Sequence, residues 1–179
     1  MQTKKNFKLI FGLGNPKKEF LFSRHNIGFL FLDFLAENLT LKKWQRGKGF
    51  FYQKGTVGKR EIVLVKNGFF MNEAGLSLKK AKDFFKVKNK EILIIQDDSD
   101  IPFGKFKFSC QKGSAGHRGI ESIFKILRRK DFCRLRLGVR KTTKEGKHLK
   151  AEKYILEPFN QKEITLLPEI FQKTLDIIF

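Results

Sequence analysis

A histidine and an aspartate in this sequence have the types and positions that proton transfer requires. His25 follows the apolar run 9–13 and Asn15, and Asp97 follows the apolar run 92–95. Such runs predict buried strands, and in an α/β sheet ligands bind at the carboxyl ends of the strands. If the two strands are parallel neighbours, His25 and Asp97 meet there. A carboxylate fixes the tautomer of a histidine and makes it a general base near neutral pH.

Water is the nucleophile that we expect for such a base. The sequence has no G-x-S-x-G segment that would present a serine, and Cys110 and Cys133 lack that context as well. Asn15 and Asn72 carry amides that donate and accept hydrogen bonds, so we expect them to orient water or to stabilise an oxyanion. Structural alternatives stay open: His25 packed at a helix start, Asn15 in a turn and Asn72 as a helix N-cap.

Two other kinds of site compete with this interpretation. Asp97, Asp98 and Asp100 either form an Asx turn or bind Mg²⁺ together with a phosphate substrate. A dinucleotide-binding loop needs a glycine at position 17, where this sequence has a lysine, so a nucleotide cofactor is disfavoured and we expect no cofactor. His117, in the small-residue segment 113–119, is interpreted as a loop residue.

The charge balance predicts a polyanionic partner. The 179 residues include 38 Lys and Arg against 18 Asp and Glu, a formal net charge of +20. This excess favours nucleic acid over a membrane surface as the partner. A solvated lysine surface with no binding role is the alternative.

Several features indicate a cytoplasmic protein. The sequence has no run of about 18 apolar residues that would span a membrane, and no signal-type apolar segment follows the polar and basic residues 1–8. Cys110 and Cys133 have no metal-ligand spacing, so we expect two reduced thiols.

Predicted strands and helices alternate along the chain, as in α/β folds. Apolar runs and alternation predict strands at 7–13, 50–57, 61–65, 92–95, 105–110 and 134–139. Helical spacing predicts helices over 26–39, after Asn72, after the segment 113–119, and from Asn160 towards Phe179. Turn or loop structure is expected at 42–49, at 101–104 and, as a mobile basic loop, at 140–150. We predict one α/β domain over residues 1–179, with a mixed, mostly parallel twisted sheet flanked by helices.

Five segments, taken together, resemble bacterial peptidyl-tRNA hydrolase. They are Gly12-Leu13-Gly14-Asn15-Pro16, Arg24-His25-Asn26-Ile27-Gly28, Phe70-Met71-Asn72, Asp97-Asp98 with Asp100 and Pro102, and Gly113-Ser114-Ala115-Gly116-His117. Their order and spacing run through almost the whole chain. Residues 154–159 also resemble the segment that precedes the last helix of that family.

The resemblance implies a monomeric, metal-free esterase that cleaves the bond between a peptide's carboxyl group and the ribose of tRNA. On the matching positions, His25 is the base that activates water, and Asp97 is its partner. Asn15 and Asn72 are implied to place the substrate and stabilise the oxyanion. The residues implied to bind substrate are Met71 in the peptide groove, and Lys107 and Arg136 on the tRNA-facing surface, with Lys105 as the alternative to Lys107.

This sequence departs from the family pattern in three places. Phe20 stands where the family usually has a tyrosine, and Arg118 stands where it usually has an asparagine; both are assigned to substrate binding. The sequence also ends at Phe179, where many relatives continue. Arg118 is expected to meet either a phosphate near the acceptor end of tRNA or the acidic cluster that contains Asp97.

Two other functions remain as alternatives. One is a non-catalytic RNA-binding relative of the same fold, which Arg118 and the high charge would suit. The other is a Mg²⁺-dependent phosphoester enzyme built on the acidic cluster at 97–100.

Overall fold

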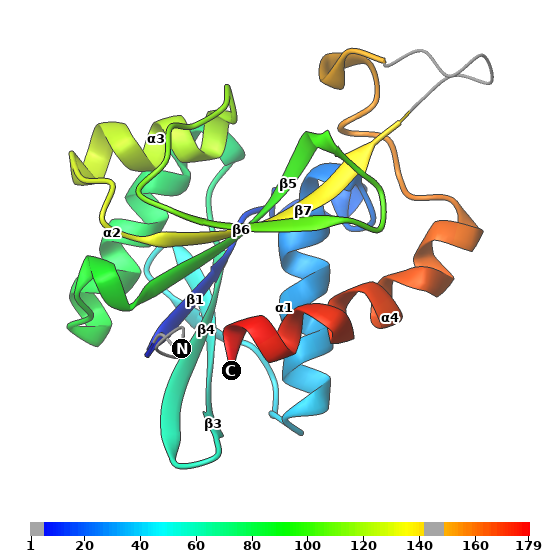
Figure 1. The fold of residues 1–179 in the computed structure, drawn as a ribbon. Helices are drawn as coiled ribbons and strands as arrows, with labels where there is room; N and C mark the ends of the chain where they lie inside the picture. The colour runs from blue at the N-terminus through cyan, green and yellow to red at the C-terminus, as the bar shows by residue number, and fades with distance from the viewer. Residues whose placement is uncertain (1–5, 142–148) are drawn as a thin grey trace.

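One twisted sheet joins all the strands that the computed structural model describes, over residues 6–141 and 149–179 (Figure 1). Its strand order is β2-β3-β4-β1-β5-β7-β6. The strands are β1 (Leu9–Gly12), β2 (Gln45–Gly47), β3 (Phe50–Val57), β4 (Arg60–Asn67), β5 (Ile92–Pro102), β6 (Phe106–Cys110) and β7 (Cys133–Arg140). The α-helices are α1 (Ile27–Asn38), α2 (Ala74–Phe85), α3 (Arg118–Leu127) and α4 (Gln161–Ile178).

The predicted mixed α/β sheet is confirmed, but it is not mostly parallel, because the described strands form as many antiparallel pairs as parallel ones. Parallel pairing joins β1 to β4, β1 to β5 and β5 to β7 at the centre of the sheet. Antiparallel pairing joins β2 to β3, β3 to β4 and β6 to β7 towards its edges. Because β1 and β5 are parallel neighbours, the segments that follow them meet at one edge of the sheet, as the sequence analysis required of His25 and Asp97.

Helices cover both faces of the sheet, with α2 and α3 on one side and α1 and α4 on the other (Figure 1). Alternate residues of the central strands point into the two cores, so β1 sends Ile10 towards α1 and α4, and Leu9 and Phe11 towards α2 and α3. A central parallel strand is buried on both faces, which explains the unbroken apolar runs at 9–13 and 92–95.

Most predicted elements are confirmed with small changes in their bounds. The hairpin of β3 and β4 is present, and Asn160 caps α4 in a capping box with Glu163. The stretch 42–49, expected to be a loop, contains the edge strand β2. Of the basic loop expected at 140–150, residues 142–148 lie outside the described residues.

Two expectations about polar segments are wrong. The acidic segment after Ile95 does not leave the sheet for a turn at 101; β5 continues to Pro102, with a register shift between Asp98 and Pro102 where it pairs with β7. Asn72 is not an N-cap: it lies in the short 3₁₀ helix η3 (Met71–Glu73), and Glu73 occupies the cap position of α2.

The expectation of two reduced thiols is wrong for this structure, in which Cys110 and Cys133 form a disulfide. The cause is strand register, because β6 and β7 place the two residues directly opposite each other with their Cα atoms 4.1 Å apart. Residue spacing along the chain, 23 positions, gave no sign of this pairing.

Among the helices of residues 6–141 and 149–179, none combines the length and the hydropathy that a membrane-spanning helix needs.

Gly28 lets α1 lie directly on the strands that carry the polar segments. A Cβ atom at this position would lie 2.5 Å from the carbonyl oxygen of Leu13 and 2.6 Å from that of Ile95. Both are backbone atoms of the sheet edge, so the neighbours cannot yield by rotating a side chain. The close approach fixes how the start of α1, and the turn before it, sits over β1 and β5.

We expect Gly28→Ala to lower the free energy of unfolding by at least about 1–3 kcal/mol, the usual cost of forcing extra atoms into a packed site. Gly113→Ala is the matched control: nothing lies within 4 Å of its Cβ, and its φ is not positive, so we expect a change within about 0.5 kcal/mol. Urea unfolding of both variants measures this. Equal stability of the two would contradict the packing role of Gly28.

Candidate active site

Reciprocal hydrogen bonds hold the segment between β1 and α1 that carries His25. The Asn15 backbone N–H donates to Asn26 Oδ1 (2.8 Å), and Asn26 Nδ2 donates back to the Asn15 carbonyl (3.0 Å). The 3₁₀ helix η2 (Arg24–Asn26) follows, and the His25 backbone N–H donates to the Ile155 carbonyl (2.9 Å). His25 therefore starts from a backbone fixed on both sides, although it precedes α1 as a helix-start residue would.

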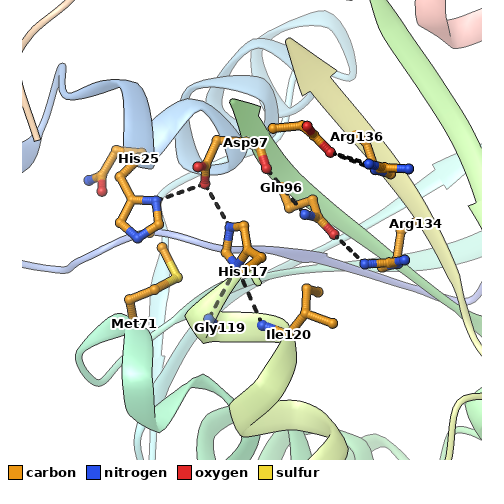
Figure 2. A network of polar contacts seen from close by, with 12 residues as sticks. His25, Met71, Gln96, Asp97, His117, Gly119, Ile120, Arg134 and Arg136 are labelled. Carbon is orange, nitrogen blue, oxygen red and sulfur yellow. Dashed lines mark hydrogen bonds and ion pairs between the residues drawn. The ribbon is translucent and has the colours of Figure 1, made fainter. Parts of the chain in front are cut away.

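A single carboxylate oxygen holds two histidines (Figure 2). Asp97 Oδ1 lies 2.9 Å from His25 Nδ1 and 2.9 Å from His117 Nε2. The Asp97 side chain is 4% exposed, so water does not compete with these partners for its charge. The two rings lie side by side with their centroids 5.3 Å apart. The predicted pairing of His25 with Asp97 is thus present, and His117 joins it.

The N-terminus of α3 fixes the tautomer of His117. His117 is the N-cap residue, and its Nδ1 accepts hydrogen bonds from the backbone N–H groups of Gly119 (3.1 Å) and Ile120 (3.4 Å). A nitrogen that accepts carries no proton, so the ring proton is on Nε2 and is donated to Asp97. His117 is therefore a neutral donor that supports the carboxylate. Its interpretation as a loop residue only is wrong.

The same carboxylate fixes His25 in the opposite tautomer. An ionised carboxylate accepts hydrogen bonds and donates none, so His25 Nδ1 must donate to Asp97 Oδ1. The neutral His25 ring therefore carries its proton on Nδ1. Its Nε2 then has a lone pair that is available for accepting a proton. This is the state that a general base requires.

Electrostatics set the protonation of both groups. Burial lowers the pKa of His25, but attraction to Asp97 and the hydrogen bond from Nδ1 raise it by more, while Arg118 lowers it; the net pKa lies above 6.5. Burial raises the pKa of Asp97, yet its interactions with His25 and His117 bring that pKa well below its usual range. Asp97 is therefore ionised at neutral pH.

A cavity of about 640 Å³ opens at this edge of the sheet and collects most of the predicted site residues. Its lining includes His25, Asp97 and His117, and also Asn15, Phe20, Met71, Asn72 and Arg118. Asn15 Oδ1 accepts from the Met71 backbone N–H (2.8 Å), so the group that Asn15 can offer a substrate is its NH₂ donor. Asn72 is exposed at the rim.

Lys107 and Arg136 lie outside the cavity, opposite each other on β6 and β7. This register favours Lys107 over Lys105, which precedes β6, as the neighbour of Arg136. Arg136 is ion-paired to Asp98 (2.6 Å) and its side chain is 18% exposed, whereas Lys107 is exposed. Lys107 is therefore the more accessible cation of the two.

Arg118 does not pair with Asp97, one of the two partners considered for it. In the described residues no ion pair joins them, because the two histidines occupy Asp97 Oδ1 and bury the carboxylate. Arg118 is exposed at the cavity as the first residue of α3. The acidic-cluster alternative for Arg118 therefore lacks support from the geometry.

The geometry also opposes a bound metal. His25, Asp97 and His117 offer three ligand atoms within 4.8 Å of one another. A metal on His117 Nε2 would force the ring proton onto Nδ1, which already faces two N–H donors, or would require an imidazolate. In the acidic segment, Asp98 accepts from Arg136 and from the Asp100 backbone N–H, which is the Asx-turn alternative and not a set of open Mg²⁺ ligands.

We expect the pKa of His25 to lie above 6.5 when its ring is titrated by NMR. Arg118→Ala should raise it further, because that change removes a nearby positive charge; Asp97→Asn should lower it, because that change removes the attraction and leaves burial. Lys54→Ala, on β3 and far from the site across the sheet, is the control and should leave the pKa of His25 unchanged. An Arg118→Ala variant with a lower His25 pKa would contradict the arrangement.

The sequence matches the family model described as peptidyl-tRNA hydrolase over residues 9–178. Curated relatives include the peptidyl-tRNA hydrolases of Pseudothermotoga lettingae, 33% identical over 96% of this chain and 88% of the relative, and of Desulfitobacterium hafniense, 36% identical over 93% of this chain and 88% of the relative.

Solved structures agree with these sequence matches. A crystal structure of a peptidyl-tRNA hydrolase in complex with N-propanol superimposes with a TM-score of 0.84 at 26% identity, and covers 98% of this chain and 88% of that one. The peptidyl-tRNA hydrolase of Acinetobacter baumannii gives 0.83 at 25% identity, over 99% of this chain and 91% of that one. Because the family model matches residues 9–178, nearly the whole of this chain, the chain belongs to the peptidyl-tRNA hydrolase family.

Proposed function

We propose that His25 is the general base in the hydrolysis of peptidyl-tRNA, the reaction of this family, and that Asp97 orients it. The observation that supports this most strongly is the shared oxygen of Asp97, which gives His25 an unprotonated Nε2 at a cavity large enough for an ester substrate. The carboxylate also stabilises the imidazolium that forms when His25 takes a proton.

The proposed reaction uses water as its second substrate. His25 Nε2 accepts a proton as the water oxygen bonds to the carbonyl carbon of the ester. The tetrahedral intermediate then breaks its bond to the ribose oxygen, and the imidazolium returns the proton to that oxygen. The products are free tRNA and the peptide with its carboxyl group. No metal is needed, since a histidine of this kind deprotonates the water.

Two asparagines are proposed to place the substrate and to stabilise the negative charge that develops on the carbonyl oxygen. The NH₂ group of Asn15 is held in place by the bond from Met71 to its Oδ1, so its donor is preorganised towards the cavity. Asn72 follows Met71 at the rim and is proposed to place the substrate. Met71 and Phe20 are proposed to contact the peptide through apolar surface.

The tRNA is proposed to lie on the basic surface that includes Lys107 and Arg136, with Arg118 on a phosphate near the acceptor end. Arg118 is exposed, lines the cavity and lacks the Asp97 pairing, so its guanidinium is available for bidentate phosphate contact. The non-catalytic RNA-binding alternative is less well supported, because binding alone would not need the His25, Asp97 and His117 arrangement. We also propose a monomer that works in the cytoplasm, where its tRNA substrate is found.

His25→Ala should lower kcat by on the order of 10²–10⁴, the usual contribution of a general base. Asp97→Asn should lower kcat less, because the imidazole remains but loses its fixed tautomer. Single-turnover hydrolysis of peptidyl-tRNA measures both, and binding of uncharged tRNA should stay within about threefold of wild type as the control. A His25→Ala enzyme with kcat within a few-fold of wild type would rule out the assignment.

Lys107→Ala and Arg118→Ala should each weaken tRNA binding and reduce the slope of log Kd against log salt concentration by up to about one, since each removes one phosphate contact. Lys54→Ala is the matched control: it removes an exposed lysine on β3, which lies in the half of the sheet away from β6 and β7. The measurement is tRNA binding between low and physiological salt. Slopes equal to that of Lys54→Ala would contradict the proposed tRNA surface.

A further inference from the structure

The residues of the loop that carries His117 do little to hold it in one conformation. Residues 111–117, named here the cap loop, are mostly exposed and rich in small side chains. Gln111, Ala115 and Gly116 have positive φ angles, a conformation that costs energy at the two residues other than glycine. Such a loop needs external contacts to hold one conformation.

Arg134 of β7 supplies such a contact from inside the protein. It is 1% exposed and is the largest fully buried side chain in the described residues. Its Nη2 donates to the Gly113 carbonyl in the cap loop (2.6 Å), and its Nη1 donates to Gln96 Oε1 on β5 (3.1 Å; Figure 2). One rigid guanidinium thus ties the loop to the strand that carries Asp97.

Gln96 extends this connection to the backbone of Asp97. Its side chain is buried, and its Nε2 donates to the backbone carbonyl of Asp97 (3.1 Å). The amide of Gln96 therefore links the guanidinium of Arg134 to the residue that both histidines contact. The loop, the guanidinium, the amide and the backbone of Asp97 form one continuous chain of hydrogen bonds.

The charge of Arg134 is hard to explain by stability alone. In the described residues no carboxylate forms an ion pair with it, and burial and the neighbouring Arg136 lower its pKa while Asp98 raises it. A buried cation without a paired anion is costly compared with an apolar side chain of similar volume. Its presence in the core is explained if the short, charge-assisted bond to Gly113 fixes a conformation that hydrolysis needs.

We infer that Arg134 is a positioning residue for the hydrolysis reaction: its guanidinium holds the cap loop against β5, so that His117 caps α3 and reaches Asp97 at the same time. The inference rests on the proposed catalytic role of His25 and Asp97. Arg134 touches neither substrate nor the reacting atoms. It acts through Gly113 on one side and Gln96 on the other.

The test uses two substitutions and a control in the full chain. Arg134→Met keeps the length of the side chain and removes every donor, whereas Arg134→Lys keeps the charge but replaces the two-armed fork by one ammonium group. Leu64→Ala is the control, a truncation on β4 in the core that packs against α1 and α4, on the other face of the sheet from α3. Circular dichroism identifies a temperature at which all variants are folded, and the assays are run at that temperature.

Two readouts separate positioning from general destabilisation. The first is peptidyl-tRNA hydrolysis: Arg134→Met should lower kcat by up to about 100-fold, the cost of misplacing a reacting group by about 1 Å, with KM changed by less than about threefold. The second is ¹⁵N NMR of the histidine rings. His117 should be wholly in the Nε2–H tautomer in the wild type and a mixture of tautomers in Arg134→Met, with Arg134→Lys between them in both readouts.

The outcomes decide the proposal. Loss of kcat together with a mixed His117 tautomer, both absent from Leu64→Ala, supports it. Arg134→Met with wild-type tautomer and kcat overturns it, and if that variant does not fold, Arg134→Lys with wild-type values does the same. A mixed tautomer with unchanged kcat also overturns it, and places the failure in the proposed catalytic role of Asp97 and not in the loop.

Discussion

One oxygen atom of Asp97 determines the chemistry of this site. Because Oδ1 accepts from both His25 and His117, the two rings are fixed in opposite tautomers, one as a base with a free Nε2 and the other as a neutral donor. The carboxylate is buried, so its full negative charge acts on these two rings. In a member of the peptidyl-tRNA hydrolase family, this arrangement suits the role proposed for His25 as the general base of ester hydrolysis.

Separate parts of the fold meet at this carboxylate. The parallel pairing of β1 and β5 brings Asn15, His25 and Asp97 to one edge of the sheet, and Gly28 lets α1 approach the same edge. The N-terminus of α3 is the third part of the site. Its backbone N–H groups determine which nitrogen of His117 bears the proton. The three parts come from distant segments, so only the tertiary structure assembles them.

The sequence allowed much of this to be predicted, and the failures have physical causes. Buried parallel strands appear in the sequence as apolar runs, so the sheet and the pairing of His25 with Asp97 could be predicted. The resemblance of the motifs to the family could also be recognised from the sequence. His117 was missed because a cap residue is defined by backbone N–H directions, although its place between a small-residue loop and a helical pattern was a usable signal.

Strand register could not be predicted from the sequence either, which is why the disulfide of Cys110 with Cys133 and the pairing of Arg136 with Asp98 were not predicted. Arg134 gave no signal, since an arginine in a strand looks exposed until its neighbours are known.

The most direct test of the shared-oxygen arrangement is neutron diffraction from deuterated crystals of the free protein, at a pH above the pKa of His25. The account predicts deuterium on His25 Nδ1 and on His117 Nε2, both directed at Asp97 Oδ1, and none on His117 Nδ1 or His25 Nε2. Deuterium on His25 Nε2 in the neutral ring, or on His117 Nδ1, would contradict it, because the base would then have no lone pair facing the substrate or the cap of α3 would be broken.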